Sequence, residues 1–280
     1  MSDYLKTLPQ YFIPKRALNR FAGFMANLRI PRIKNYLIQD FVYKYQVNMA
    51  EALEPNPLNY ASFNEFFIRR LKPGARPIAD ERIISPVDGS ISEIGHLTDG
   101  QLLQAKNHHY SVLALLGGDE ALAAQFQSGC FATLYLSPKD YHRVHMPIEG
   151  CLQESIYVPG SLFSVQPTTA RVVPNLFARN ERLVCIFSTA LGPMAMILVG
   201  AAIVGSIGTT WGGDVIRSTS LQRTHYPIEG TRSIVLDKAM EMGYFKLGST
   251  VILLFTHQAQ MTWAAHLTAG DEIRLGQALV

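Results

Sequence analysis

The sequence predicts an α+β protein in which N-terminal amphipathic helices are followed by a mostly β domain. Three observations support this class. Apolar residues recur with helical spacing within residues 1–50, whereas from about residue 83 they gather in short blocks bounded by glycine and proline. The length of 280 residues allows one large domain with a small appendage. We place the boundary at residue 60, with a helical segment over 1–60 and the main domain over 61–280.

The N-terminal segment is predicted to form amphipathic helices on either side of Pro31. The second helix runs through residue 45. In the first helix, an apolar stripe at i, i+3, i+4, i+7 and i+10 consists of Leu18, Phe21, Ala22, Met25 and Leu28.

Positive charge is concentrated in the same segment. Residues 1–50 hold eight basic and two acidic residues, although the whole chain has a net charge of only +3. The remainder is therefore slightly acidic, which argues against nucleic acid as a partner. Basic residues beside a Phe- and Leu-rich face are typical of a helix that lies on an anionic lipid surface. An ordinary amphipathic helix packed on its own domain explains these residues equally well.

Two features bear on membrane targeting. Pro9 and Pro14 interrupt the only stretch that resembles a secretory signal, so none is expected. Residues 183–213 carry no charge and are long enough for a membrane-spanning helix. Glycines and the pair Gly192-Pro193 divide this run into short blocks rich in Val and Ile, which favours buried strands.

The main domain is predicted from its apolar blocks. A short helical stretch over 64–71 ends at a Lys-Pro-Gly turn. Further short helices are expected within 110–116 and 119–126. The expected strands are 90–94, 131–136, 184–187, 194–199 and 251–255.

The first candidate for chemistry is the pair His142 and His145. Two histidines three residues apart often form half of a metal site, but the sequence offers no matching set of further ligands. The three cysteines are scattered without CxxC spacing, so neither a zinc site nor a disulfide framework is expected. No metal is predicted. The pair could instead supply acid and base catalysis, or consist of two half-exposed loop histidines.

Two further candidates are Asp88 and the dipeptide Gly248-Ser249. Asp88 precedes a glycine, where aspartate is usually plain turn chemistry, although a carboxylate there could orient a histidine. Ser249 stands at the start of a buried strand, and Gly248 tolerates strained backbone angles that expose its carbonyl to attack. Taken alone, this dipeptide is more typical of a strand-entry turn.

Together these motifs resemble the bacterial-type phosphatidylserine decarboxylases. The resemblance covers about residues 60–260, with the motifs in family order, and rests on residues 66–78, 85–89, 140–147, 157–160, 176–182, 199–201, 204–207, 241–245 and 247–250. One departure is Asn107, where glycine is expected. Asparagine also tolerates left-handed backbone angles, so the departure has little weight.

The resemblance implies a self-processing proenzyme. Asp88, His145 and Ser249 would form a triad in which His145 deprotonates Ser249 and Asp88 orients His145. Attack on the Gly248 carbonyl and β-elimination would divide the chain into residues 1–248 and 249–280, leaving a pyruvoyl group derived from Ser249. This covalent cofactor would form a Schiff base with phosphatidylserine and accept electrons as carbon dioxide leaves. His142 would supply the acid and base for decarboxylation to phosphatidylethanolamine.

The resemblance also implies partners and a location. The substrate is a membrane lipid, which favours the lipid-surface interpretation of residues 1–50 and a peripheral enzyme on the cytoplasmic side of the inner membrane. The two cleaved chains would remain together as a heterodimer, and further dimerisation is left open. Two rival functions are kept: a membrane-surface serine hydrolase that uses Asp88, His145 and Ser249 without cleavage, and a non-catalytic membrane-binding module.

Overall fold

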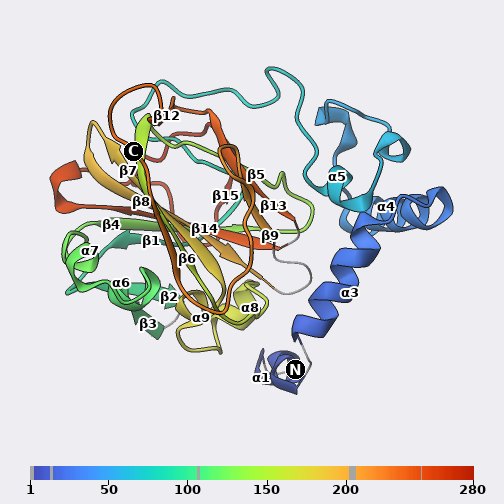
Figure 1. Ribbon diagram of the computed structural model, residues 1–280, viewed down its shortest axis with the longest axis horizontal. Coiled ribbons are helices and arrows are strands. Elements are labelled where there is room, and N and C mark those ends of the chain that lie inside the picture. Colours follow the sequence, from blue (N-terminus) through green and yellow to red (C-terminus); the bar gives the residue numbers. More distant parts are fainter. Residues whose placement is uncertain (1–2, 13–14, 106–107, 202–205, 247) are drawn as a thin grey trace.

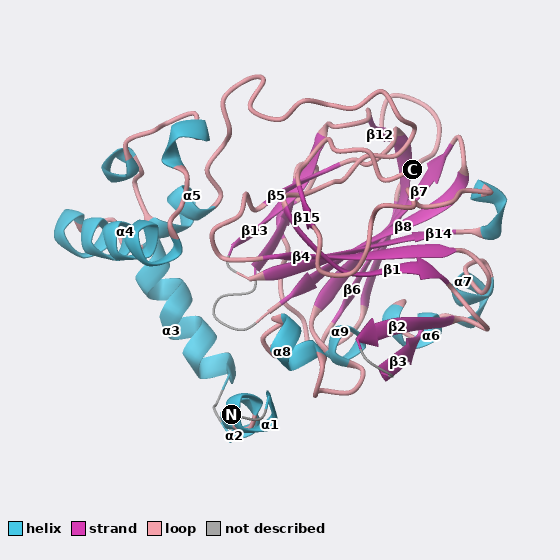
Figure 2. Ribbon diagram, turned by 180° about the vertical axis from the view of Figure 1, so that it is seen from behind, coloured by secondary structure: helices cyan, strands magenta, loops and turns pink. Residues whose placement is uncertain are grey.

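The structure, a computed structural model, describes residues 3–12, 15–105, 108–201, 206–246 and 248–280. It confirms the α+β class, because short N-terminal helices precede a mostly β domain (Figure 1 and Figure 2). Several residues quoted above lie outside the described part of the chain: Pro14, Asn107, Val204, Gly205 and Leu247.

The N-terminal helices are α1 (Asp3–Thr7), α2 (Pro9–Phe12), α3 (Lys15–Asn27), α4 (Pro31–Tyr45) and α5 (Phe63–Phe67). Pro31 occupies the first turn of α4, where its missing N–H costs nothing. Ser62 caps α5 by accepting a hydrogen bond from the Glu65 N–H. Helices α3, α4 and α5 share a small core that includes Ala26, Ile38 and Phe67. This core extends past residue 60, where the domain boundary was predicted.

The main sheet has nine strands in the order β11-β6-β7-β8-β14-β4-β1-β15, with β12 also pairing with β6. All these pairings are antiparallel. The strands are β1 (Gly89–His96), β4 (Cys130–Leu136), β6 (Gly150–Val158), β7 (Arg182–Thr189), β8 (Gly192–Gly200), β11 (Gln222–His225), β12 (Ile234–Leu236), β14 (Ser249–Phe255) and β15 (Glu272–Ile273).

Smaller elements cover the main sheet. A four-stranded sheet, in the order β10-β9-β13-β5, contains β5 (Arg143–His145), β9 (Ser206–Thr209), β10 (Gly213–Asp214) and β13 (Glu241–Lys246). The other strands and α-helices are β2 (Gln101–Ala105), β3 (His108–Ser111), α6 (Val112–Leu115), α7 (Glu120–Ala124), α8 (Pro167–Ala170) and α9 (Leu176–Arg179). The helix expected within 110–116 therefore begins only at Val112, because the preceding residues pair in β3.

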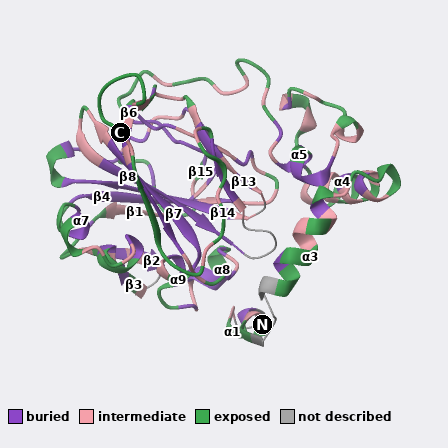
Figure 3. Cartoon of the chain, in the orientation of Figure 1, coloured by how far each residue is buried: buried purple, intermediate pink, exposed green. Residues whose placement is uncertain are grey.

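Strand β14 lies inside the molecule, between β8 and β4 (Figure 3). Its side chains alternate between two hydrophobic cores. Val251, Leu253 and Phe255 join one core together with residues of the four-stranded sheet. Ile252 and Leu254 join the other, beneath β2, β3 and the short helices. Because both faces are buried, the strand is an uninterrupted apolar run in the sequence.

The uncharged run over 183–213 forms strands, as predicted. Its described residues lie in β7, β8 and β9, at the start of β10, and in the turns beside these strands. Within the described part of the chain, none of the helices has the length and apolar character needed to cross a membrane.

Candidate functional site

Ser249 is the first residue of β14 and is completely buried. Its backbone lies between Gly200 of β8 and Leu136 of β4, so its position is fixed from both sides. Its hydroxyl lies 3.3 Å from Nδ1 of His142. The structure thus brings two of the predicted site residues together across more than one hundred residues of sequence.

Gly248 precedes this strand with a φ of 58°. The angle lies in the left-handed region, which glycine adopts at little cost and other residues disfavour by about 1 kcal/mol or more. The chain therefore turns sharply at the peptide bond where cleavage is predicted.

His142 is also completely buried, in the segment that links β4 to β5. Its Nε2 lies 3.0 Å from the Ser137 carbonyl oxygen. Because a carbonyl can only accept, Nε2 carries the proton, and Nδ1 is left as the acceptor for the Ser249 hydroxyl. Burial, aided by the charge of Arg69, lowers the pKa of His142 to about 3. The ring is therefore neutral at physiological pH.

His145 lies in β5 with both ring nitrogens engaged elsewhere. Nδ1 donates to the Ala239 carbonyl oxygen at 2.7 Å, and Nε2 accepts from the Tyr141 hydroxyl at 3.1 Å. Ala239 has a φ of 66°, an uncommon angle for alanine that aims its carbonyl at the imidazole. Burial lowers the pKa of His145, while the Ala239 carbonyl and nearby carboxylates oppose this shift.

Asp88 stands immediately before β1, where its carboxylate forms an ion pair with Arg76. Nη2 and Nε of Arg76 donate to its oxygens at 2.6 and 2.9 Å. The Leu275 N–H donates a further hydrogen bond at 2.9 Å. Gly89 allows the neighbouring strand β4 to approach β1 closely, because a Cβ at this position would lie 2.2 Å from the Tyr135 carbonyl oxygen.

The predicted triad is therefore not assembled in this conformation. Ser249 contacts His142 rather than His145, and the hydrogen bonds of Asp88 go to Arg76 and Leu275. Against the effect of burial, the charge of Asp88 raises the pKa of His145, but less than the Ala239 carbonyl and Glu241 do. The roles assigned to the two histidines stay predictions.

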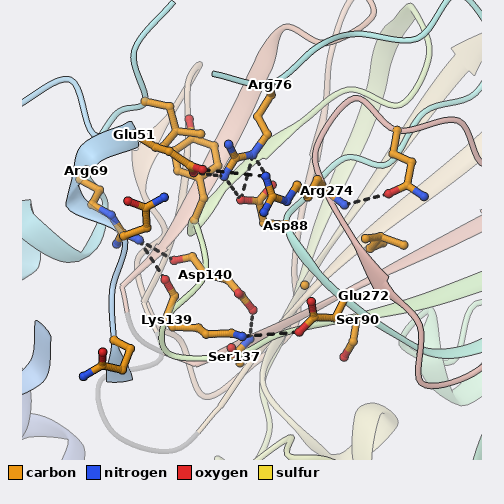
Figure 4. Close-up of a pocket in the computed structure, with 17 residues that line it drawn as sticks. Glu51, Arg69, Arg76, Asp88, Ser90, Ser137, Lys139, Asp140, Glu272 and Arg274 are labelled. Carbon is orange, nitrogen blue, oxygen red and sulfur yellow. Dashed lines mark hydrogen bonds and ion pairs between the residues drawn. The ribbon is translucent and has the colours of Figure 1, made fainter. Parts of the chain in front are cut away.

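A cavity of about 650 Å³ lies beside the turn that leads to His142 (Figure 4). Its charged lining residues are of both signs: Glu51, Arg69, Arg76, Asp88, Lys139, Asp140, Glu272 and Arg274. Arg76 links two of the carboxylates, because its Nη2 also donates to Glu51 at 2.7 Å. Such a lining suits a ligand that carries both a positive and a negative group.

Several residues of this region had been given no function from the sequence. Arg76 belongs to the quoted N-terminal motif, but nothing in that motif identifies Asp88 as its partner. Phe67 stacks on the His142 ring with 4.1 Å between centroids. Tyr141 lies within the quoted histidine motif, residues 140–147, but no role was predicted for it.

The histidine pair is not part of a metal cluster in the part of the chain that the structure describes. No group of three or more His, Cys, Asp or Glu side chains able to hold a metal ion is found among those residues.

Comparison with known proteins gives a consistent result over nearly the whole chain. Residues 63–280 match the family model described as phosphatidylserine decarboxylase, and residues 5–46 match a model described as PSD. A protein of Legionella pneumophila named phosphatidylserine decarboxylase proenzyme is 56% identical over 277 residues, covering 99% of this chain and 98% of that protein. A protein of the same name from Polaromonas naphthalenivorans is 53% identical over 281 residues, covering 100% and 97%.

Proposed function

The chain belongs to the phosphatidylserine decarboxylase family, and from this premise we propose that it decarboxylates phosphatidylserine with a pyruvoyl group made from its own Ser249. The observation that carries the proposal is the buried Ser249 hydroxyl, held 3.3 Å from an imidazole nitrogen and directly after a left-handed glycine. The product would be phosphatidylethanolamine.

Self-processing would use groups that the chain itself supplies. The Ser249 oxygen bonds to the Gly248 carbonyl carbon as the peptide C–N bond breaks, which converts the amide into an ester. Removal of the Ser249 α-proton then breaks the Cβ–O bond and releases the Gly248 carboxylate. Water replaces the nitrogen of the resulting dehydroalanine, and ammonia leaves. A pyruvoyl group supplies an electron sink for decarboxylation.

We assign Asp88 and His145 to the cleavage step and His142 to decarboxylation. For cleavage, the His145 ring must exchange its contacts with Ala239 and Tyr141 for the Ser249 hydroxyl. In the competing assignment, His142 accepts the Ser249 proton directly, as the 3.3 Å distance favours. For decarboxylation, Nδ1 of a neutral His142 faces the reacting position, where it can accept a proton and later return it.

Complete burial of Ser249 also bears on the serine-hydrolase alternative. The attack on Gly248 is internal, so the cleavage step needs no access from outside. Complete burial of Ser249 is therefore compatible with self-processing, whereas an external ester or lipid would have to gain access to this position.

The sheet supports the proposal that the cleaved chains stay together. Every partner of β14 belongs to residues 1–248, since it pairs with β8 and β4 along its length. A cut before Ser249 leaves these pairings intact, and the β15–β1 pairing adds a second attachment.

The charged cavity supports binding of the substrate head group. Phosphatidylserine carries an ammonium, a carboxylate and a phosphodiester, and the cavity presents both cations and carboxylates. It lies beside Ser137, whose carbonyl holds His142, so a head group there would be close to the reacting position.

The N-terminal helices support peripheral membrane binding, for which we propose the cytoplasmic face of the inner membrane. Phe21 and Phe24 of α3 are 63% and 64% exposed, and Leu18 is exposed beside them. Ala26 is instead buried within the protein. The aromatic face of α3 therefore points outward, as an interfacial helix requires, and Arg20 is exposed near it.

Replacing Phe21 and Phe24 together with serine is expected to weaken binding to vesicles of phosphatidylcholine and phosphatidylserine by about 10-fold or more, because each buried Phe side chain contributes up to about 1.5–3 kcal/mol. Co-sedimentation measures the binding. The matched control replaces exposed Ile216 and Ile228 of the main domain with serine. Equal binding by the two double variants would contradict the proposed membrane face.

The activity itself is tested with purified protein and vesicles containing phosphatidylserine. Formation of phosphatidylethanolamine with release of carbon dioxide is expected, together with two chains on a denaturing gel. Active protein that remains one full-length chain would overturn the pyruvoyl proposal while leaving the family membership intact.

A further inference from the structure

We propose that Phe67 and Arg69, at and just beyond the end of α5, are positioning residues that hold His142 against the group at position 249. The proposal rests on the function proposed above, because it assumes that His142 acts on that group. The proposal makes α3, α4 and α5, together called the N-terminal helical unit, a part of the reaction site as well as a candidate for contact with the membrane.

Phe67 controls one face of the imidazole. Its ring lies 4.1 Å from the His142 ring between centroids and is inclined by only 28°. Both side chains are completely buried. Phe67 is in turn surrounded by aromatic rings of the helical unit, with Phe41 at 5.8 Å and Phe63 at 6.1 Å. The plane of His142 is therefore set by packing that originates in α4 and α5.

The turn over residues 137–140 controls one edge of the imidazole. The Ser137 carbonyl accepts from His142 Nε2 and from the Asp140 N–H, both at 3.0 Å. The Asp140 carboxylate accepts from the Ser137 N–H at 2.7 Å. With its face and one edge fixed, the ring can present only Nδ1 to position 249.

Arg69 fastens this turn to the end of α5. Its Nη2 donates to the carbonyl oxygens of Lys139 and Asp140, at 3.0 and 3.2 Å. The side chain is buried, and its Nε and Nη1 have no hydrogen-bond partner among the described residues. Its guanidinium also lies over the Phe66 ring, 5.6 Å from the ring centre, and nearby carboxylates such as Asp140 favour its charged form.

The charge of Arg69 has a second effect on His142. It disfavours the imidazolium form and adds to the effect of burial in lowering the pKa of His142. A neutral ring with its proton on Nε2 keeps the Nδ1 lone pair directed at position 249. Phe67 thus sets the orientation of the ring, and Arg69 sets the turn beneath it and favours its neutral form.

The test compares Phe67→Leu with Phe126→Leu, using phosphatidylserine in detergent mixed micelles so that docking on a bilayer is not limiting. Phe126 is also completely buried, but it belongs to the core beneath β2, β3 and the short helices and not to the aromatic cluster around Phe67. In processed Phe67→Leu protein, kcat is expected to fall about 10- to 100-fold while KM stays within about 2-fold. Phe126→Leu should keep the wild-type kcat despite a similar loss of buried aromatic packing.

If Phe67→Leu does not fold, a second pair of variants tests the proposal. Arg69→Met is compared with Arg70→Met, since Arg70 is adjacent and exposed. A fall in kcat for Arg69→Met alone, partly restored by Arg69→Lys, supports the proposal. Equal kcat values within either measurable pair would overturn it. Failure of the proposed function would be visible separately, as a wild-type protein that neither cleaves nor decarboxylates.

Discussion

Replacing Ser249 with alanine is expected to leave one uncut chain of 280 residues without decarboxylase activity. Alanine has no oxygen to attack the Gly248 carbonyl, so neither the ester nor the pyruvoyl group can form. Since enzymes of this kind accelerate their reactions by about a million-fold or more, loss of the cofactor should lower activity by at least about 1,000-fold. Intact mass measures the cleavage, and phosphatidylethanolamine formation measures the activity.

The adjacent Thr250 provides a matched control. It is completely buried in the same strand, and its hydroxyl has no hydrogen-bond partner among the described residues. Thr250→Val preserves the shape of the side chain and should still yield fragments 1–248 and 249–280. A cleaved Ser249→Ala protein, or one with wild-type activity, would exclude Ser249 as the source of the cofactor.

His142→Ala is expected to be cut normally but to lose decarboxylation by about 100-fold or more, the range typical of a missing acid or base. His145→Ala is expected to remain uncut, and therefore inactive. This assignment is the one that the family resemblance implies. His142 presents Nδ1 to the place where the cofactor would form, which agrees with a role in decarboxylation. A denaturing gel and an activity assay on each variant separate the two roles.

The opposite result, in which cleavage depends on His142 and not on His145, also has a structural basis. If His142→Ala remains uncut while His145→Ala is processed, the 3.3 Å contact between His142 and Ser249 is the proton-transfer pair of cleavage, and our assignment is wrong. His225, which lies on the exposed strand β11, serves as the control histidine. His225→Ala should be processed and active.

Local pattern was enough to predict the elements that surround Ser249. The apolar run after Ser249 forms β14, and the blocks around residues 131–136, 184–187 and 194–199 form β4, β7 and β8. These predictions succeed because burial on both faces of a central strand requires consecutive apolar residues. The helices on either side of Pro31 were predictable for a similar reason, since proline favours the first turn of a helix.

The residues just before α6 show where the local sequence pattern is insufficient. The sequence predicts a short helix within 110–116, and α6 occupies Val112–Leu115 of this range. Tyr110 and Ser111 instead belong to β3, which pairs with β2. The packing of Phe63 and Phe67 with α3 and α4 likewise depends on contacts between segments that are distant in the sequence.

By itself, the sequence determined the fold class, the strand that begins at Ser249, the glycine before it and the two candidate histidines. These depend on residue type and on spacing within about ten positions. Only the tertiary structure decided which histidine meets Ser249, that Arg76 is the partner of Asp88, and that Phe67 covers the His142 ring. His142 and His145 are three residues apart and chemically identical, so the surrounding strands and turns, and not the motif, select the one whose nitrogen faces the serine.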